Sequence, residues 1–249
     1  DSYVVSPVFF PGGNIGELAV YGTVNDLSMV GAKPLCMSAG LILEEGFLMN
    51  DLKKILASMA DAAKRSGVKI IAGDTKVVNR GKGDGIFINT SGIGILDDGV
   101  NISPSNIKSG DKIIVSGTIG NHGVAVMAER NGLSFNPPVL SDTAPLNQMV
   151  QEIIGYGGVH AMRDPTRGGL ATTLKEMALE SGLCFSIREA SIPVPDGVRG
   201  ASELLGIDPL YIANEGILIA VVRKDAAESL LAILRKNPLG KDANIIGEV

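Results

Sequence analysis

The chain has 249 residues, of which 45% are hydrophobic and 20% charged, so it can build a substantial core and is not a disordered chain. Its formal net charge of −5 argues against sequence-independent nucleic-acid binding, which needs a basic surface. No apolar run approaches the length of a membrane span and no signal peptide is visible, so we expect a cytoplasmic protein without a membrane segment.

The first part of the chain alternates apolar strand-like runs with helical patterns. Asn14 is expected to cap a helix that reaches Val30, and Asn50 a second helix that ends at Gly67. The short run Val68–Ala72 reads as a buried strand that ends in Gly73-Asp74-Thr75. The other expected strands are Tyr3–Phe9, Leu35–Leu43 and Ile86–Leu96.

A polar stretch rich in Asp, Asn, Ser, Pro and Gly lies between Asp97 and Gly110, and we place a domain boundary there, with domains 1–104 and 105–249. A second alternating series follows it. Helices are expected over Asn121–Asn131, Ala144–Tyr156, Gly168–Ser181, Val198–Leu205 and Lys224–Lys236. Strands are expected over Asp111–Gly117, Val159–Arg163, Leu183–Ile187, Gly216–Val222 and Ile245–Val249. The pattern predicts a two-domain α/β or α+β protein, with either parallel or mixed sheets.

The familiar catalytic motifs are absent. There is no Walker A loop, no GxGxxG after a strand, no GxSxG elbow and no HExxH. Cys36 and Cys184 lack a CxxC partner, so we expect two buried thiols in a reducing compartment rather than a zinc ribbon, a redox pair or a disulfide framework. His122 and His160 alone cannot form a conventional histidine-rich metal site.

Three aspartates stand in unusual surroundings. Asp1 opens the first strand, Asp26 lies in a nearly apolar helix, and Asp74 follows a buried strand. A buried carboxylate is costly unless it is paired or bound to a cation, and Mg²⁺ prefers oxygen ligands. The alternative is that each aspartate is an ordinary cap or turn residue.

Residues next to Asp74 have the chemistry of a phosphate site. Lys76 is two positions further on, so an extended chain puts both side chains on one face, where Lys76 can neutralise a phosphate. Thr75 and Asn89 are candidate hydrogen-bond partners. The alternative for Lys76 is a solvated surface lysine.

Two segments lead into helix N-termini, which favour anions. Asp164 and Arg167 belong to Arg163-Asp164-Pro165-Thr166-Arg167-Gly168-Gly169, where Arg167 adds donors for a phosphate or a carboxylate. His122 starts another helix, where a neutral imidazole can act as a base. Glu215 precedes a buried strand. The alternatives are that Asp164 and Thr166 merely cap a helix and that Glu215 faces solvent.

Several motifs together are similar to one family. They occur in this order: Phe9-Phe10-Pro11-Gly12-Gly13-Asn14-Ile15-Gly16, Thr23-Val24-Asn25-Asp26, Ile42-Leu43-Glu44-Glu45-Gly46, Gly73-Asp74-Thr75-Lys76-Val77-Val78, Gly120-Asn121-His122-Gly123, Arg163-Asp164-Pro165-Thr166-Arg167-Gly168-Gly169 and Ala213-Asn214-Glu215-Gly216. The ordered set resembles the HypE family of hydrogenase maturation proteins. That family belongs to the superfamily of aminoimidazole ribonucleotide synthetase, selenophosphate synthetase and thiamine monophosphate kinase.

The resemblance implies a PurM-like fold, with a ferredoxin-like N-terminal domain and an α+β C-terminal domain. It implies a homodimer formed through the N-terminal sheets, with ATP and Mg²⁺ held near the interface. The resemblance makes Asp1, Asp26 and Asp74 the metal and phosphate ligands. We assign nucleotide binding to Asp1, Asn25, Asp26, Asp74, Thr75, Lys76 and Asn89.

The activity implied is ATP-dependent dehydration of a carboxamide, which the HypF carbamoyltransferase places on a C-terminal cysteine, to a thiocyanate. The HypC–HypD complex then carries the cyano group to the iron of NiFe hydrogenase. Glu215 or His122 is expected to act as the base, with Asp164 and Arg167 positioning the reacting end.

Two parts of the family pattern are missing from residues 1–249: a glycine-rich loop before Asp1 and the tail with the acceptor cysteine. We therefore expect these residues to bind ATP without completing a turnover. Two alternatives stay open. The chain is a selenophosphate synthetase or thiamine monophosphate kinase of the same superfamily, or it is a non-catalytic nucleotide-binding scaffold for metallocentre assembly.

Overall fold

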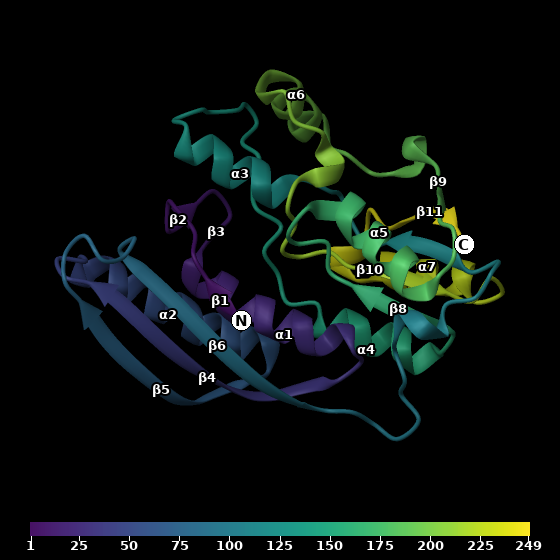
Figure 1. Cartoon of the computed structure of the whole chain (residues 1–249), viewed down its shortest axis with the longest axis horizontal. Coiled ribbons are helices and arrows are strands. Elements are labelled where there is room, and N and C mark those ends of the chain that lie inside the picture. Colours follow the sequence, from purple (N-terminus) through teal and green to yellow (C-terminus); the bar gives the residue numbers. More distant parts are fainter.

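The computed structural model describes residues 1–249 as two α/β units joined by a linker (Figure 1). The N-terminal unit contains one long sheet, a short hairpin and two helices. Its elements are β1 (Ser2–Tyr3), β2 (Phe9–Phe10), β3 (Gly13–Asn14), α1 (Ile15–Met29), β4 (Lys33–Glu44), α2 (Met49–Ser66), β5 (Lys69–Val78) and β6 (Ile86–Ile95). The fold is therefore mixed α/β, as the sequence predicts.

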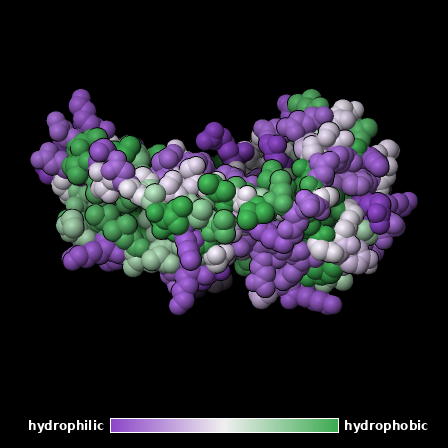
Figure 2. All heavy atoms as spheres, turned by 90° about the horizontal axis from the view of Figure 1, so that it is seen from below, coloured by the Kyte–Doolittle hydropathy of each residue, from purple (hydrophilic) through white to green (hydrophobic).

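The N-terminal sheet has the strand order β1-β6-β4-β5, with β4 and β5 parallel and the other neighbours antiparallel. Alternate residues of β4, such as Ala39 and Leu41, pack on α1 and α2 in a single apolar core. The opposite face has no helix of this chain on it. Ile42 and Ile93 are 42% and 63% exposed there, and Figure 2 shows apolar side chains gathered over this half of the molecule.

Helix α1 is buried on nearly all sides, since 12 of its 15 residues are buried. One side packs on the N-terminal sheet and the other on the C-terminal unit. Asn14 caps the helix through a hydrogen bond from Gly16 N, as the sequence predicts. The buried polar side chains of α1 therefore need partners in the protein. Asn25 finds three of them: Nδ2 donates to the carbonyls of Ala144 and Glu215, and Oδ1 accepts from Leu146 N at 2.8 Å.

The C-terminal unit is built on a fully antiparallel sheet with the order β8-β10-β7-β11-β9. Its strands are β7 (Lys112–Val115), β8 (Val159–Arg163), β9 (Ser186–Ile187), β10 (Ile219–Val222) and β11 (Asn244–Glu248). Its helices are α3 (Asn121–Arg130), α4 (Asn147–Tyr156), α5 (Gly169–Ser181), α6 (Asp196–Leu205) and α7 (Ala227–Lys236), with short 3₁₀ turns between them. Helices α4 and α7 contribute to one apolar core and α5 to another, so the sheet is covered on both faces.

Some expected elements differ from the structure. The strand expected over Tyr3–Phe9 is two short strands, because Pro7 between them lacks the N–H that a sheet ladder needs. Strand β5 continues through Asp74 to Val78 and is exposed along nearly its whole length, since it forms the sheet edge and no helix covers its outer face. Helix α2 begins at Met49, so Asn50 is not its cap.

The thiols are not buried as expected, because Cys36 is half-buried and Cys184 is exposed. Neither of them forms a disulfide. None of the helices has both the length and the apolar character that crossing a bilayer would require.

The contacts of Asn25 give a test of how the two units are joined. Replacing Asn25 by Ala removes three hydrogen bonds and leaves the buried Leu146 N–H without a partner, so we expect the free energy of unfolding to fall by about 1–3 kcal/mol. Denaturant unfolding without nucleotide measures the change. The control is Asn131→Ala, because Asn131 is an exposed residue that donates to Met127 O. Equal losses in both variants would show that the Asn25 bonds contribute little.

Candidate functional site

A cavity of about 970 Å³ opens where the two units meet. Its walls come from the N-terminus, α1, the start of α3, the β8–α5 connection and the segment before β10. Six of the candidate residues line it: Asp1, Asp26, His122, Asp164, Arg167 and Glu215. The structure therefore brings together side chains that lie up to 214 positions apart in the sequence, from Asp1 to Glu215.

The N-terminus of α5 forms one wall of this cavity. Gly168, with φ 75°, precedes the helix in the left-handed conformation, and no side chain caps the first turn. Asp164 and Thr166 are thus not the helix caps that the alternative interpretation required. Arg167 lies beside this turn, exposed and outside the ion pairs of the protein, whereas Arg163 pairs with Glu176 at 2.6 Å. Free backbone N–H groups and an unpaired guanidinium together make a wall that favours an anion.

Three carboxyl groups line the same cavity. Desolvation, and next the charge of Asp164, raise the pKa of Asp26 to about 6, although its side chain opens to the cavity. Burial also raises the pKa of Asp164. The pKa of Glu215 is raised well above its ordinary value by burial first and then by the charges of Asp142, Asp164 and Asp26. Uncompensated negative charge is therefore costly here, and a bound cation would relieve it.

His122 is buried in the first turn of α3, and burial lowers its pKa to about 4. The imidazole is neutral at pH 7, as the sequence predicts, but the cause is burial rather than the helix end. Its Nδ1 lies 2.9 Å from Ser141 Oγ, and Phe10 meets the ring edge-to-face at 5.3 Å. The ring is therefore held in a fixed orientation at the cavity wall.

The other candidates lie outside the cavity. Asp74 pairs in register with Gly40, between the inward residues Ala39 and Leu41, so it points away from α1 to the open face of the sheet. Lys76 is on the same face, 3.3 Å from the Asp74 carboxylate, as the two-residue spacing predicts.

Asn89, Thr75 and Asn25 complete the set of candidates outside the cavity. Asn89 donates to Asp1 O and Ser2 Oγ at the sheet surface. Thr75 is exposed on β5, and the Asn25 amide holds the two units together. No group of three carboxylate, histidine or cysteine side chains is preformed as a metal site.

Sequence reasoning missed two polar groups next to the cavity. Tyr3 has a buried hydroxyl without a hydrogen-bond partner. Asp142 lies behind the wall, next to the Glu215 main chain. The signal for Asp142 in the sequence is only a polar Ser-Asp-Thr run, which looks like any loop, so its burial could not be read from residue type.

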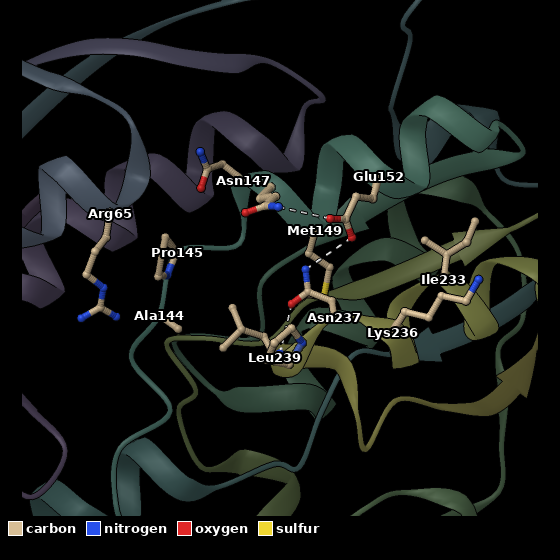
Figure 3. Close-up of a pocket in the computed structure, with 12 residues that line it drawn as sticks. Arg65, Ala144, Pro145, Asn147, Met149, Glu152, Ile233, Lys236, Asn237 and Leu239 are labelled. Atoms are coloured by element: carbon tan, nitrogen blue, oxygen red, sulfur yellow. Dashed lines mark hydrogen bonds between the residues drawn. The ribbon is translucent and has the colours of Figure 1, made fainter.

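A second cavity, of about 810 Å³, lies between α2, α4 and the end of α7 (Figure 3). It contains none of the candidate residues. Arg65 and Lys236 stand at opposite sides of it, and Glu152 accepts hydrogen bonds from Gln148 and Asn237. These internal bonds leave no cluster of reactive groups there.

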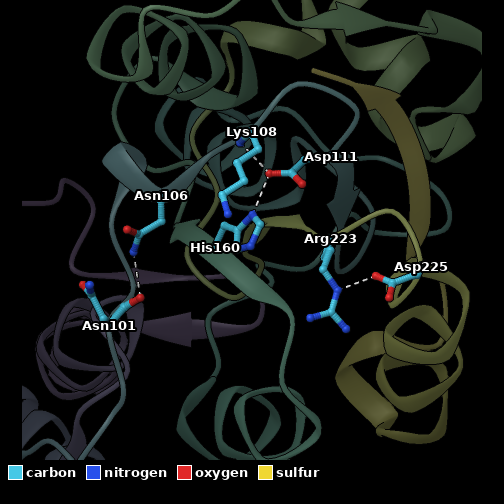
Figure 4. Close-up of polar contacts among 7 residues, drawn as sticks. All are labelled: Asn101, Asn106, Lys108, Asp111, His160, Arg223 and Asp225. Atoms are coloured by element: carbon cyan, nitrogen blue, oxygen red, sulfur yellow. Dashed lines mark hydrogen bonds and ion pairs between the residues drawn. The ribbon is translucent and has the colours of Figure 1, made fainter.

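The remaining histidine, His160 in β8, contacts the linker between the units (Figure 4). Asp111 is buried, and its Oδ2 lies 2.7 Å from His160 Nδ1 and accepts from Lys108 N. Ser103 N also donates to His160 O at 3.0 Å. Neither residue lines the cavity, and the pair fastens the linker to β8, which is a structural role.

Comparison with known proteins assigns both units. Residues 1–96 match the N-terminal domain model, and residues 108–249 the C-terminal domain model, of AIR synthase related proteins. The carbamoyl dehydratase HypE of Bradyrhizobium diazoefficiens is 55% identical over 100% of this chain and 72% of its own length. That of Escherichia coli is 47% identical over 100% of this chain and 74% of its own length. This chain belongs to the HypE family.

The solved structures agree with the assignment. A crystal structure of HypE in complex with ATP superposes with a TM-score of 0.98 at 49% identity, covering 100% of this chain and 74% of that one. A HypE–HypF complex gives 0.98 at 55% identity, covering 100% and 82%. Thiamine monophosphate kinase from Aquifex aeolicus, at 18% identity, a TM-score of 0.74 and coverage of 100% and 79–83%, shows only the shared fold. The PurM-like fold and the resemblance to HypE are therefore confirmed.

The raised pKa of Asp26 predicts how pH affects the HypE-family fold. The folded protein holds this proton more tightly than the unfolded chain, so stability falls as pH rises from about 4 through about 6. We expect Asp26→Asn to raise the free energy of unfolding at pH 7.5 and to give a much smaller gain at pH 4.5. Urea unfolding without nucleotide at both pH values checks this. A variant that is less stable than wild type at pH 7.5 would contradict it.

Proposed function

We propose that this chain binds ATP in the cavity between the two units and uses it to dehydrate a protein-bound carboxamide to a nitrile. Relatives that are 46–55% identical are named carbamoyl dehydratase HypE, and a HypE structure contains ATP. The observation that carries the proposal is the cavity itself. It combines an anion-favouring helix end with carboxyl groups that need a cation, which are the two halves of a metal–nucleotide site.

The polyphosphate would lie against the uncapped turn of α5. Arg167 would donate to phosphate oxygens without first breaking an ion pair, whereas Arg163 is already engaged by Glu176. The donor set of Asp1 and Asp26 fits Mg²⁺, because both offer carboxylate oxygens at one cavity wall. Bound Mg²⁺ would offset the negative charge of the phosphates and of Asp26.

The chemistry needs a leaving group and a base. Transfer of the γ-phosphate makes the carboxamide oxygen able to leave, and one nitrogen proton is lost to water as the phosphorylated imidate forms. A base then removes the second nitrogen proton as phosphate departs. His122, with a pKa of about 4, is a weak base at neutral pH, whereas the raised pKa of Glu215 makes its carboxylate a stronger one. We therefore assign the proton to Glu215, and assign His122 and Asp164 to positioning the reacting group.

A homodimer would use the open face of the N-terminal sheet. Its exposed apolar side chains form the kind of patch that marks a protein interface. Asp74 and Lys76 are on this same face, so in such a dimer they face the second subunit. We propose that they contribute to nucleotide binding there, which would account for their distance from Asp26 within one chain.

The partners follow from the family. A HypE–HypF complex has been solved, and we propose that this chain likewise receives its carbamoyl group from HypF. Transfer of the cyano group to HypC–HypD, the boundary between domains 1–104 and 105–249, and a cytoplasmic location stay predictions. A selenophosphate synthetase or thiamine monophosphate kinase activity is disfavoured, since the 18% identical kinase shares only the fold.

The role of Glu215 separates an enzyme from a scaffold. We expect Glu215→Gln to lower the dehydration rate of carbamoylated full-length protein at least about a hundredfold, because a general base contributes 10²–10⁴-fold. ATP affinity should change less than about twofold, since the residue is not assigned to the nucleotide. Phosphate release and ATP titration measure the two effects. Wild-type dehydration by the variant would remove Glu215 from the mechanism, and no release by wild type at saturating ATP and Mg²⁺ would favour the scaffold.

The dimer is tested on the sheet face. Ile93→Lys places a charge on an apolar side chain that is 63% exposed, so the fold should persist while the dimer dissociates. Sedimentation velocity should show the wild type as a dimer and the variant as a monomer with weaker ATP binding. Leu179→Lys, on α5 and 72% exposed, is the matched control and should leave the dimer intact. A dimeric Ile93→Lys variant would place the interface elsewhere.

A further inference from the structure

The segment Ser141-Asp142-Thr143 lies behind the cavity wall and touches both residues considered as the base. Ser141 Oγ lies 2.9 Å from His122 Nδ1 and 2.6 Å from Thr143 Oγ1. Asp142 Oδ2 accepts hydrogen bonds from Glu215 N and Gly216 N, both at 3.2 Å. The segment is itself held by Ser141 N, which donates to Pro11 O in the N-terminal unit. These bonds fix the site on both sides of the domain junction.

The contact between Asp142 and the Glu215 segment is too close to be incidental. A Cβ added at Gly216 would lie 1.7 Å from Asp142 O, so only glycine allows the two backbones to approach this closely. Asp142 Oδ1 is buried and has no hydrogen-bond partner. This unsatisfied oxygen costs stability, and it is not needed for the two main-chain hydrogen bonds that Oδ2 accepts. An asparagine amide at this position could accept the same two hydrogen bonds without burying a negative charge. Something other than stability favours a carboxyl group here.

The charges around this pair are mostly of one sign. Burial raises the pKa of Asp142 to about 6, against the lowering effect of backbone N–H groups that include those of Glu215 and Gly216. The charges of Asp142, Asp164 and Asp26 all act on Glu215. The other titratable groups that line the cavity are Asp1 with the N-terminal amine, Tyr3, His122, Arg163, Arg167 and Glu176. Two carboxyl groups in one poorly solvated site cannot both ionise cheaply, so the charge of Asp142 affects the proton affinity of Glu215.

We propose that Asp142 is a positioning residue for Glu215: its Oδ2 fixes the Glu215 main chain, and its charge strengthens Glu215 as a base. This rests on the proposed role of Glu215. Before the step concerned, the carboxamide has been phosphorylated on oxygen and has lost one of its two nitrogen protons to water. In the step itself, the remaining proton moves from the imidate nitrogen to a Glu215 carboxylate oxygen and phosphate leaves. The bond to the phosphorylated oxygen breaks, and the nitrogen–carbon bond becomes triple. Glu215 then returns the proton to solvent through the cavity. Asp142 touches neither substrate nor nucleotide.

Asp142→Asn tests this with little change of shape. The amide oxygen can accept from the same two N–H groups, while an NH₂ replaces the unpartnered oxygen, so the fold and the tie are kept and the charge is lost. In carbamoylated full-length protein, the acid limb of the pH profile of phosphate release should move down by about one pH unit, with a lower plateau. The KM for ATP should stay within twofold. Asp208→Asn is the matched control, because Asp208 is exposed and accepts from Leu210 N at 2.9 Å.

A direct titration separates failure of this inference from failure of the proposed function. With ¹³C-labelled side-chain carboxyls, the Glu215 resonance, identified by its loss in Glu215→Gln, should titrate at lower pH in Asp142→Asn than in wild type. An unshifted titration, or a rate loss that is equal at every pH, would overturn the coupling. If the coupling is present but Glu215→Gln is fully active, the coupling stands and the assignment of Glu215 as base falls.

Discussion

The main constraint on this structure is the crowding of carboxyl groups where its two units join. Asp26, Asp164 and Glu215 face one cavity and Asp142 lies behind its wall, and loss of water raises the pKa of each. A folded protein that keeps such a cluster gives up stability at neutral pH. In the proposed complex a bound cation would offset the carboxylates while α5 and Arg167 would hold the phosphates, so that ligand binding would restore this stability. The lower stability of the ligand-free protein and the proposed affinity for a metal–nucleotide complex thus have the same cause.

Helix α1 makes this crowding possible. Because it is buried between the N-terminal sheet and the C-terminal unit, it brings Asp26 to residues that follow β8 and precede β10. Asn25, one position earlier, points into the protein and holds the 144–146 segment and the Glu215 carbonyl. Two neighbouring residues of α1 therefore have different roles. The Asn25 amide connects the two units, and the Asp26 carboxylate faces the cavity. The domain junction and the site cannot be altered independently.

Much of this organisation could be predicted from the sequence, because it depends on local signals. Asn14 as a cap, the amphipathic pattern of α2 and the alternation of strands and helices identified the elements and the mixed fold. The ordered motifs identified the family. The extent of β5 could not be predicted, since an apolar run followed by Gly-Asp-Thr looks like a strand end. Whether it continues is decided by nine residue pairings with β4, interrupted by one register shift, and these contacts are tertiary.

The site was predictable in its residue types and not in its geometry. Asp26 and Asp74 carry the same chemistry in the sequence, yet one faces the cavity and the other the open sheet face, because strand parity turns Asp74 away from α1. The position of Asp142 could not be predicted from the sequence for the same reason. It lies next to Glu215 because Gly216 has no side chain and lets the two backbones approach closely.

A fold shared with a kinase at 18% identity thus leaves the chemistry undetermined. What distinguishes this site is which carboxyl groups are close enough to change each other's proton affinity. That closeness is set by contacts between residues that are dozens of positions apart, such as Asp142 with Glu215, so it belongs to the folded chain and not to any single motif.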